Sequence, residues 1–382
     1  DSLGHDAGDK LLTEVARRLS DNVRKFDTVA RLGGDEFAIL LPDLNRSESE
    51  HLADKLYQIV SEAYEVQHKR IMVSLSIGIV HYPEDGEDAK TLLQHADSAM
   101  YQAKRKRSVF SHYDQNVDFY RQNRLTLIQD LSHALANDQL MLFYQPQLYC
   151  QINEIVGAEA LLRWNHPTFG FMPPEKIIDL AEYCGNIHQL TMWVIGQAIS
   201  ECRNWHDQGF HINVSINLSV QDLNNESLCE QLGKVLQQHQ LSPDYLTLEI
   251  TESGMMENPA LSLETLNRLK DMGIKLSVDD FGTGFSSLKY LKQLPVDELK
   301  IDRSLVMDME NDENDRVIVQ STINLGHNLG LQVVAEGVET EAMLNSIDEY
   351  GCDRAQGCLF EKPLPAADFL RYLETNQKKK IA

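Results

Sequence analysis

Eight short apolar segments, separated by stretches with helical apolar spacing, occupy the chain from residue 141 onward. The segments are MLFYQPQ, VGAEALLRW, INVSINLS, YLTLEIT, IKLSVDD, ELKID, QVVAEG and CDRAQG. Strands that alternate with helices build parallel sheets, and eight strand-helix units are the number that closes a (βα)8 barrel. The sequence therefore predicts an α/β fold whose larger part is a TIM-like barrel.

The residues before the barrel predict a smaller α+β domain. RLGGDEFAILL contains a Gly-Gly turn that runs into an apolar strand, and IMVSLSIGIV is a second strand candidate. Helical apolar spacing occurs at residues 11–19, 47–64 and 91–106. We expect this domain to cover residues 1–110.

A helical linker is expected over residues 111–124, followed by the barrel over residues 125–378. The linker is polar and aromatic, without the Gly/Ser richness of a flexible tether, and helical spacing begins at its end. Because the first residues already belong to a motif, we expect part of the first domain to lie upstream of Asp1. The first domain is therefore predicted to be truncated.

The charge of the chain restricts its partners. The 382 residues include 58 acidic and 35 basic side chains, a formal net charge of -23. Such a chain repels a nucleic-acid polymer and lacks the basic patch that binding one requires. No run approaches the roughly 18 apolar residues of a membrane helix. We expect no membrane contact from this sequence and a cytoplasmic location, with a membrane anchor in a longer parent left open.

Polar side chains recur at the ends of the predicted barrel strands. A single carboxylate at a strand end is often only a helix cap. Here the pattern continues through successive strands, and a barrel gathers such strand ends around one mouth. These residues are Glu159, Asn217, Glu249, Asp279, Asp280, Lys300, Glu336 and Gln356.

The residue types at this mouth predict a site for hard metal ions. Carboxylate and amide oxygens, without histidine or cysteine among them, suit Mg²⁺ or Mn²⁺ better than zinc. Two such ions about 3.5 to 4 Å apart can activate a water and stabilise both oxygens of a phosphodiester displacement. Lys300 would add a fixed positive charge near that water or the phosphate; an ion pair at the barrel rim is the alternative for it.

Several motifs together resemble the EAL phosphodiesterases. The motifs are EALLRW from Glu159, NLS from Asn217, EITES from Glu249, DDFGTGFSSL from Asp279, KID from Lys300, VVAEGVET around Glu336 and QG at Gln356. They occur in order over about residues 125 to 375. The resemblance implies metal-dependent opening of cyclic di-GMP (c-di-GMP) to linear pGpG.

The resemblance also implies a role for each matching position. The implied metal ligands are Glu159, Asn217, Glu249, Asp279, Asp280 and Glu336, and the implied catalytic residues are Lys300, Glu336 and Glu159. The implied substrate contacts are Gln145, Arg163, Gln356 and Asp302. A loop from Asp280 to Ser287, with Gly282 and Gly284, is expected to order one metal with support from Glu252 and Glu339.

The first domain is similar to the GGDEF diguanylate cyclases through RLGGDEF, GHDAGD and SLSIGI. The implied nucleotide and metal residues are Asp9, Arg31, Gly33, Gly34, Asp35, Glu36 and Lys104. Arg24 and Asp27 match an RxxD inhibitory site for c-di-GMP, with a helix-end ion pair as the alternative. Because of the truncation and a serine at position 108, where the family has arginine, we expect no synthesis of c-di-GMP from GTP.

Several functional readings remain open on the sequence alone. An active phosphodiesterase with two Mg²⁺ or Mn²⁺ ions is favoured, with a regulatory first domain for which GTP and Mg²⁺ are candidate ligands. The alternatives are a non-catalytic c-di-GMP receptor, an enzyme that is bifunctional in a longer parent, and a general metal phosphatase. A homodimer is expected.

Overall fold

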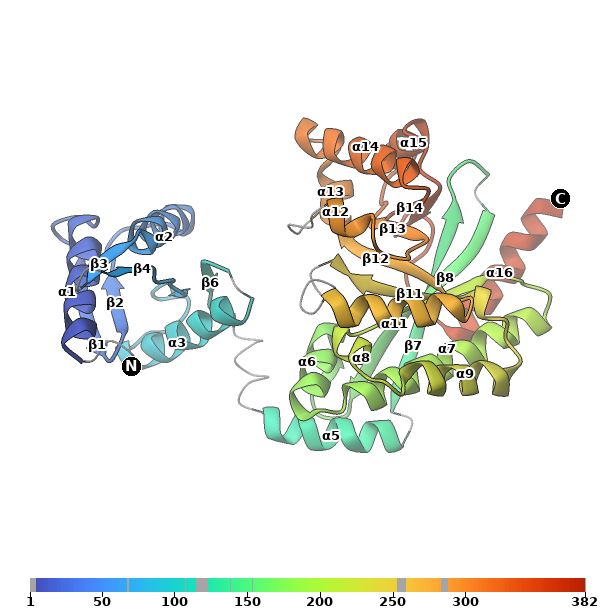
Figure 1. Cartoon of the computed structure of the whole chain (residues 1–382), viewed down its shortest axis with the longest axis horizontal. Helices are drawn as coiled ribbons and strands as arrows, with labels where there is room; N and C mark the ends of the chain where they lie inside the picture. Colours follow the sequence, from blue (N-terminus) through green and yellow to red (C-terminus); the bar gives the residue numbers. More distant parts are fainter. Residues whose placement is uncertain are drawn as a thin grey trace. The chain divides into compact units, whose positions relative to one another are not determined.

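The chain folds into two compact units, Asp1–Arg124 and Leu125–Ala382 (Figure 1). A computed structural model describes residues 5–66, 69–106, 108–114, 123–137, 139–152, 154–252, 259–282 and 288–381. Within these residues, no helix has the length and apolar composition that a bilayer crossing requires. Each unit has its own buried core and is described separately.

The first unit combines helices with three short two-stranded sheets. Two antiparallel hairpins and one parallel pair, which is bridged by α3, make up these sheets. Val15, Leu19, Leu56, Val60 and Tyr64 form its core. This mixture confirms the predicted α+β class. The elements are α1 (His5–Asp21), β1 (Thr28–Gly33), β2 (Glu36–Leu40), α2 (Arg46–Ser61), β3 (Tyr64–Val66), β4 (Lys69–Ile71), β5 (Ile77–Ile79), α3 (Ala89–Lys106) and β6 (Phe110–His112).

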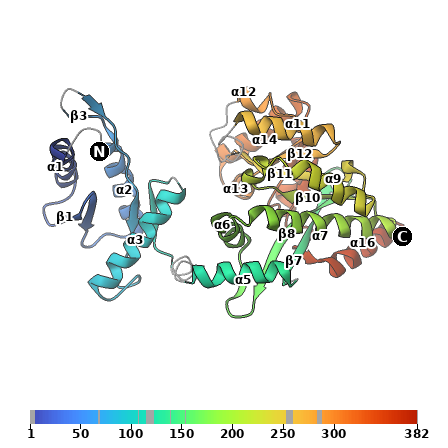
Figure 2. The ribbon, with the colours of Figure 1, turned by 60° about the horizontal axis from the view of Figure 1, so that its bottom comes forward.

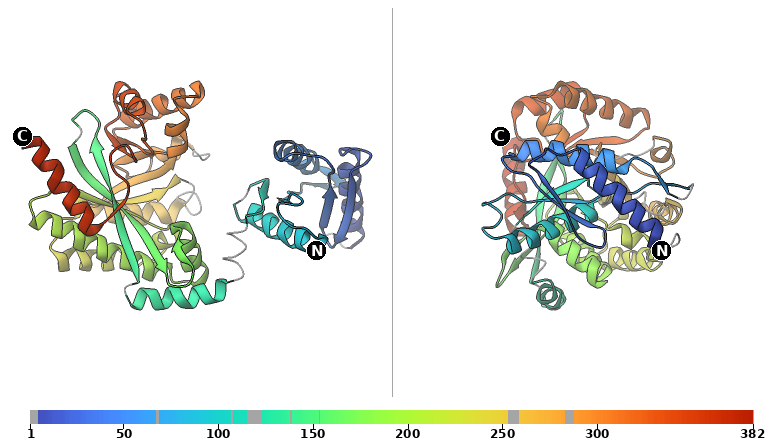
Figure 3. Two further views of the ribbon diagram at one scale, coloured as in Figure 1. Left: turned by 180° about the vertical axis from the view of Figure 1, so that it is seen from behind. Right: turned by 90° about the vertical axis from the view of Figure 1, so that its left-hand side faces the viewer.

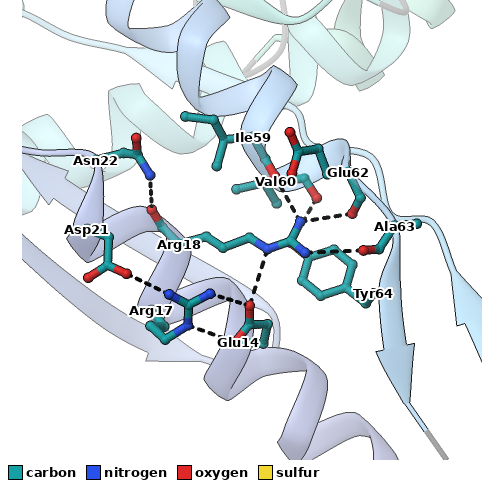
Figure 4. A network of polar contacts seen from close by, with 10 residues as sticks. All are labelled: Glu14, Arg17, Arg18, Asp21, Asn22, Ile59, Val60, Glu62, Ala63 and Tyr64. Carbon is teal, nitrogen blue, oxygen red and sulfur yellow. Dashed lines mark hydrogen bonds and ion pairs between the residues drawn. The ribbon is translucent and has the colours of Figure 1, made fainter. Parts of the chain in front are cut away.

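Arg18 fastens α1 to the end of α2 (Figure 4). The last carbonyl groups of a helix have no partner within the helix. The Arg18 guanidinium donates to the carbonyl oxygens of Ile59 at 2.9 Å, Glu62 at 2.9 Å and Ala63 at 3.2 Å. It also lies 3.8 Å from the ring centroid of Tyr64. One side chain thus satisfies three carbonyls and covers an aromatic ring of the core.

The first unit extends past residue 110, where the first domain was predicted to end. Strand β6 pairs in parallel with β5, joining Ile77 to Phe110, so the first unit continues beyond residue 110. Most of the predicted linker, residues 115–122, lies outside the described residues. Helix α5 (Arg124–Ala136) belongs, from Leu125 onward, to the second unit, where Leu127 and Leu131 are fully buried.

The second unit is the predicted closed barrel of eight strands. Figure 3 shows its ribbon from two further directions. Each of the eight apolar segments forms one strand, and each strand pairs with the next along the chain. Strand β7 pairs with both β8 and β15 and so closes the ring. The strands are β7 (Leu140–Tyr149), β8 (Glu154–His166), β10 (Asn213–Asn217), β11 (Leu246–Thr251), β12 (Lys275–Phe281), β13 (Glu298–Ile301), β14 (Gln332–Ala335) and β15 (Arg354–Gln356).

The first strand runs against the other seven, which the sequence did not predict. Strand β7 is antiparallel to β8 and to β15, whereas the remaining pairs are parallel. The reason is the short connection from Tyr149 to Glu154, since a parallel crossover needs a dozen or more residues. The predicted eight-stranded, TIM-like barrel is confirmed, but it begins with a β-hairpin where a strand-helix unit was expected.

Helices lie on the outside of the sheet (Figure 2). The Tyr144 ring of β7 packs 4.9 Å from the ring of Trp205 and 6.0 Å from that of Phe369, which anchors α7 and α16 to the barrel. Helix α16 reaches beyond residue 378, the predicted end. The remaining elements are β9 (Gly170–Met172), α6 (Pro174–Cys184), α7 (Ile187–Asp207), α8 (Val220–Leu223), α9 (Leu228–His239), η1 (Pro243–Tyr245), α11 (Pro259–Asp271), α12 (Leu288–Leu291), α13 (Arg303–Asp308), α14 (Glu313–Asn328), α15 (Glu341–Glu349), β16 (Leu364–Pro365) and α16 (Ala366–Ile381).

Candidate active site

Lys300 lies at the centre of a buried cluster of carboxylates. It is on β13 and is 1% exposed. Its Nζ atom lies 2.6 Å from Glu249 Oε2, 2.6 Å from Glu336 Oε1, 3.2 Å from Asp279 Oδ1 and 3.7 Å from Glu159 Oε2. The four carboxylates come from β8, β11, β12 and the end of β14. The parallel strands thus bring the predicted strand-end residues together at one mouth.

The pKa values of the cluster reflect burial and mutual repulsion. Burial alone would lower the pKa of Lys300, but the four surrounding carboxylates together outweigh it and hold that pKa well above its usual range. Burial raises the pKa of Glu249, with Lys300 acting in the opposite direction. Burial, followed by the charges of Asp279 and Glu159, raises the pKa of Glu336 to about 8. The single positive charge of Lys300 therefore does not balance the negative charges of the surrounding carboxylates.

Asp279, Asp280 and Glu336 are grouped as metal ligands would be. One ligand oxygen from each lies within 4.8 Å of the other two. Glu249 Oε1 is buried and has no hydrogen-bond partner among the described residues. With Glu159, these side chains amount to five carboxylates against the one ammonium of Lys300, a formal charge of -4 that two divalent ions would neutralise. The donor set fits hard metal ions.

Asp280 has a backbone conformation that side chains rarely adopt. Its φ angle is 55°, in the left-handed region. Burial raises its pKa to about 6, and the neighbouring charges of Asp279 and Asp302 act in the same direction. Strained backbone of this kind concentrates at functional sites. Here the left-handed residue lies at the register shift between Val278 and Phe281, and two consecutive aspartates stand near the end of β12 at the mouth.

Glu159 is held by amide groups on both of its oxygens. Asn217 Nδ2 donates to Glu159 Oε1 at 2.8 Å, and Gln356 Nε2 donates to Glu159 Oε2 at 2.5 Å. Gln356 Nε2 also donates to Gln145 Oε1 at 3.1 Å. The structure therefore joins two predicted metal ligands and two predicted substrate contacts in one hydrogen-bonded group.

Arg163 lies beside this group with aromatic rings on two sides. It is on β8, four residues after Glu159, and its guanidinium carbon lies 5.6 Å from the ring centroid of Phe143 and 5.9 Å from that of Phe171. Burial lowers its pKa, partly offset by the charge of Glu159. A half-buried guanidinium of this kind is suited to a phosphate.

Asp302 has a structural role as well as the predicted one. Its side chain caps α13 by accepting from the backbone N–H of Ser304 at 2.9 Å, and it also accepts from the Ser304 hydroxyl. It lies beside Asp280, whose pKa it helps to raise. The capping bond alone is a sufficient reason for an aspartate at this position. The substrate contact of Asp302 therefore stays a prediction.

The two residues predicted to support the loop are placed differently. Glu252 is buried, and its carboxylate accepts from the backbone N–H of Gly282 at 3.2 Å. Glu339 is exposed, and among the described residues we find no hydrogen bond or ion pair from it. Residues 283–287, which include Gly284, lie outside the described residues.

The GGDEF residues form the turn between β1 and β2. Arg31 donates from Nε and Nη2 to the carbonyl oxygen of Gly34 at 2.9 and 2.6 Å, and Gly34 has a φ of 49°. Asp35 and Glu36 are exposed at this turn, and the side chains of Asp9 on α1 and Lys104 on α3 are exposed as well. No hydrogen bond or ion pair joins these four side chains in the described part of the unit. Their nucleotide and metal roles stay predictions.

Arg24 and Asp27 line a cavity of about 540 Å³ in the first unit. The backbone N–H of Arg24 donates to Asp27 Oδ2 at 2.6 Å, and that of Asp27 donates to the Arg24 carbonyl at 3.0 Å. The turn therefore holds the Asp27 carboxylate against the backbone of Arg24. His51 and Lys55 of α2 line the same cavity. The inhibitory role of this pair stays a prediction.

The sequence did not predict a role for Gln147. Gln147 is buried in β7, and its Nε2 donates to Gln356 Oε1 at 3.0 Å. It lies two residues after Gln145, and residues two apart in a strand share a face. The spacing in the YQPQ segment therefore indicates that Gln147 points toward the barrel interior, as Gln145 does.

Comparisons with known proteins agree with this geometry. A family model described as "EAL domain" matches residues 128–363. The chain belongs to the EAL family. The family model "Diguanylate cyclase, GGDEF domain" matches residues 1–108, so a GGDEF domain precedes the EAL domain. EAL domains depend on metal ions, which is consistent with the grouped carboxylates.

Two similar proteins have names that refer to cyclic di-GMP. "Bifunctional diguanylate cyclase/cyclic di-GMP phosphodiesterase MucR" of Pseudomonas aeruginosa is 42% identical over 97% of this chain and 54% of its own length. "Cyclic di-GMP phosphodiesterase NbdA" of the same organism is 40% identical over 97% of this chain and 48% of its own. The chain thus spans about half the length of these relatives.

A solved structure matches the second unit. It is titled "PaMucR Phosphodiesterase, c-di-GMP complex" and is 42% identical, with a TM-score of 0.62. The match covers 64% of this chain and 99% of that one. The barrel fold of the EAL domain therefore agrees with that structure.

Proposed function

We propose that the EAL barrel of this chain hydrolyses c-di-GMP to linear pGpG with the help of divalent metal ions. The observation that carries the proposal is the buried cluster around Lys300, in which every implied ligand position holds a carboxylate or an amide. EAL-like receptors that have lost such ligands would lack this completeness. The names of MucR and NbdA support c-di-GMP as the substrate.

We propose Mg²⁺ or Mn²⁺ as the metal, with two ions in the site. Glu159, Asn217, Glu249 and Asp279 would hold one ion, and Asp280 would hold the second with Asp279 and Glu336. Bound ions of this kind supply an activated water and stabilise the charge on the oxygens of the reacting phosphodiester. The formal charge of -4 and the buried, unpartnered Glu249 Oε1 support this assignment.

The chain's own residues position the reactants. Lys300, which contacts Glu249 and Glu336 at 2.6 Å, is proposed to orient the attacking water together with Glu336. Arg163 would bind a substrate phosphate through its guanidinium fork. Gln145 and Gln356, which are hydrogen-bonded to each other, would contact the substrate beside Glu159.

The first unit is proposed to regulate the barrel rather than to synthesise c-di-GMP. Its GGDEF turn and its cavity at Arg24 and Asp27 are candidate sites for GTP with Mg²⁺ and for c-di-GMP, respectively. Homodimerisation, the cytoplasmic location and a cyclase activity of a longer parent also stay predictions.

Incubation of the purified chain with c-di-GMP tests the proposal. We expect pGpG in Mg²⁺ or Mn²⁺, none in EDTA, and little in Ca²⁺, because calcium's longer bonds and looser geometry would misplace the water. Glu159→Gln should lower turnover by about a hundredfold or more. Tight binding of c-di-GMP by the wild-type chain without turnover would instead support the receptor alternative.

A further inference from the structure

Gln147 lies one layer below the candidate active site, on the interior face of β7. It is 1% exposed and, in the strand register, stands opposite Gln356 on β15 and opposite Gly157 on β8. Its neighbour at the mouth, Gln145, stands opposite Glu159. Gln147 therefore has no access to the substrate, but it contacts a residue predicted to have that access.

The hydrogen bonds around Gln356 have one consistent direction. A carboxylate can only accept, so Gln356 must present its Nε2 group to Glu159, as it does at 2.5 Å. Its carbonyl oxygen then faces away from the mouth, where Gln147 Nε2 donates to it at 3.0 Å. Without this donor, the buried carbonyl of Gln356 would lose the partner that favours this orientation over the reversed one.

The barrel also provides space for the Gln147 carboxamide. A Cβ atom at Gly157 would lie 3.1 Å from Gln147 Oε1, tighter than most contacts of real side chains. Glycine at this position therefore lets the amide occupy the gap between β7 and β8. The donor, its acceptor and its space come from three different strands of the barrel.

We propose that Gln147 is a positioning residue for the c-di-GMP site, acting through Gln356. Its amide group fixes the orientation of the Gln356 carboxamide, and Gln356 in turn holds Glu159 and Gln145. This proposal rests on the proposed function, because Gln356 and Glu159 are assigned there to substrate and metal. A partner that orients a ligand-binding group typically changes metal affinity or activity by 10- to 100-fold when it is removed.

A double-mutant cycle tests the proposal. Gln147→Met, Gln356→Met and the double variant are compared in kcat and KM with saturating Mn²⁺, and in c-di-GMP affinity by calorimetry with Ca²⁺ in place of Mn²⁺. We expect Gln147→Met to lower kcat/KM and affinity by about tenfold. The double variant should be no worse than Gln356→Met alone, since residues that act through one another are not additive.

Three further variants serve as controls. Gln231→Met makes the same chemical change on α9, where the amide bonds Ser227 and His188 outside the barrel, and should behave as wild type. Gln147→Glu keeps the size, and burial favours a neutral carboxyl group whose O–H can still donate to Gln356, so this variant should lose less activity than Gln147→Met. Gln147→Asn keeps the amide donor on a side chain that is one methylene shorter, which moves the donor away from Gln356. This variant replaces Gln147→Met if Gln147→Met does not fold.

Each outcome decides the matter. Wild-type kinetics and affinity in Gln147→Met would overturn the proposal, as would losses that multiply in the double variant. If the wild-type chain binds c-di-GMP without turnover, the proposed reaction fails, but the calorimetric cycle still tests the positioning role. A wild-type chain that neither binds nor hydrolyses c-di-GMP overturns both.

Discussion

Lys300 is a buried ammonium group that compensates part of the negative charge of the four carboxylates around it. Removing one partner of a buried ion pair leaves an uncompensated charge and costs about 3 to 5 kcal/mol. We therefore predict that Lys300→Met lowers the free energy of unfolding of the barrel by about 3 kcal/mol in EDTA. Mn²⁺ should recover part of this loss, because cations would then compensate the carboxylates.

Urea unfolding followed by tryptophan fluorescence measures this effect. The chain's three tryptophans, Trp164, Trp193 and Trp205, all lie in the barrel unit, so the signal reports that unit. Lys234→Met is the matched control, because its partner Glu230 is exposed and such pairs contribute little. Equal effects of the two substitutions would show that burial of Lys300 has no special consequence.

The stability of the barrel should depend on pH because of His206, which lies near the end of α7. Burial lowers its pKa below the ordinary value of 6.5, opposed by its hydrogen bond to the Ile212 carbonyl at 3.0 Å. The unfolded chain therefore binds this proton at a higher pH than the folded chain does. The contribution of His206 to the free energy of unfolding is fully present above pH 6.5, and it is lost as the pH falls through the lowered pKa of the folded state.

His206→Phe tests this prediction, because phenylalanine retains a ring next to Tyr245 but does not titrate. We expect the urea midpoint of the wild type to fall more between pH 8 and pH 5 than that of the variant. The test compares how steeply the urea midpoint changes with pH, and not its absolute value, because the variant also loses the hydrogen bond to Ile212. Parallel curves would contradict the lowered pKa.

At the scale of elements, the end of α2 depends on a side chain from α1. Arg18 donates to three carbonyl groups there and covers Tyr64. Lysine has a single ammonium group and cannot reproduce this planar fork. We predict that Arg18→Lys destabilises the first unit by about 1 to 2 kcal/mol. Faster hydrogen exchange in peptides from α2 would be the measured result.

Arg17→Lys is the control for that substitution, because Arg17 bonds Glu14 and Asp21 at the exposed surface of the same helix. Its exchange rates should stay close to those of the wild type. If both substitutions accelerate exchange equally, the contact between α1 and α2 is not specific to Arg18 (Figure 4).

The elements also indicate what a sequence can predict. Continuous apolar runs predicted all eight barrel strands, and their polar ends predicted the cluster at the mouth, because parallel strands share one end. An apolar run does not specify the direction of a strand, so the sequence did not predict that β7 is antiparallel. The spacing of Gln145 and Gln147 indicated a shared face, but the hydrogen bond from Gln147 to Gln356 joins residues more than 200 positions apart and was not predicted.

Single-residue roles were less predictable than the cluster as a whole. Glu252 reaches the backbone of Gly282, whereas Glu339, in an equally acidic motif, points to no described partner. Asp302 caps a helix besides lying near Asp280. A motif specifies which residue follows which, but the direction of each side chain depends on packing between distant strands.

At the scale of the whole molecule, two units with separate cores should unfold separately. The metal candidates lie in the barrel, so a ligand that binds the folded barrel should stabilise that unit alone. Stabilisation by a bound ion follows mass action and reaches about 2.7 kcal/mol at a concentration 100 times the dissociation constant. We therefore predict that Mn²⁺ raises the tryptophan-detected transition temperature and that EDTA lowers it.

Hydrogen exchange of the first unit is the internal reference for this prediction. Peptides from α1 and α2 should exchange at the same rate in Mn²⁺ and in EDTA, whereas peptides from β11, β12 and β13 should be protected by Mn²⁺. The Asp279→Asn variant should lose this protection, because an amide nitrogen at this position removes a charge from the metal ligands. Equal protection of both units by Mn²⁺ would mean either that the metal also binds the GGDEF unit or that the two units unfold as one.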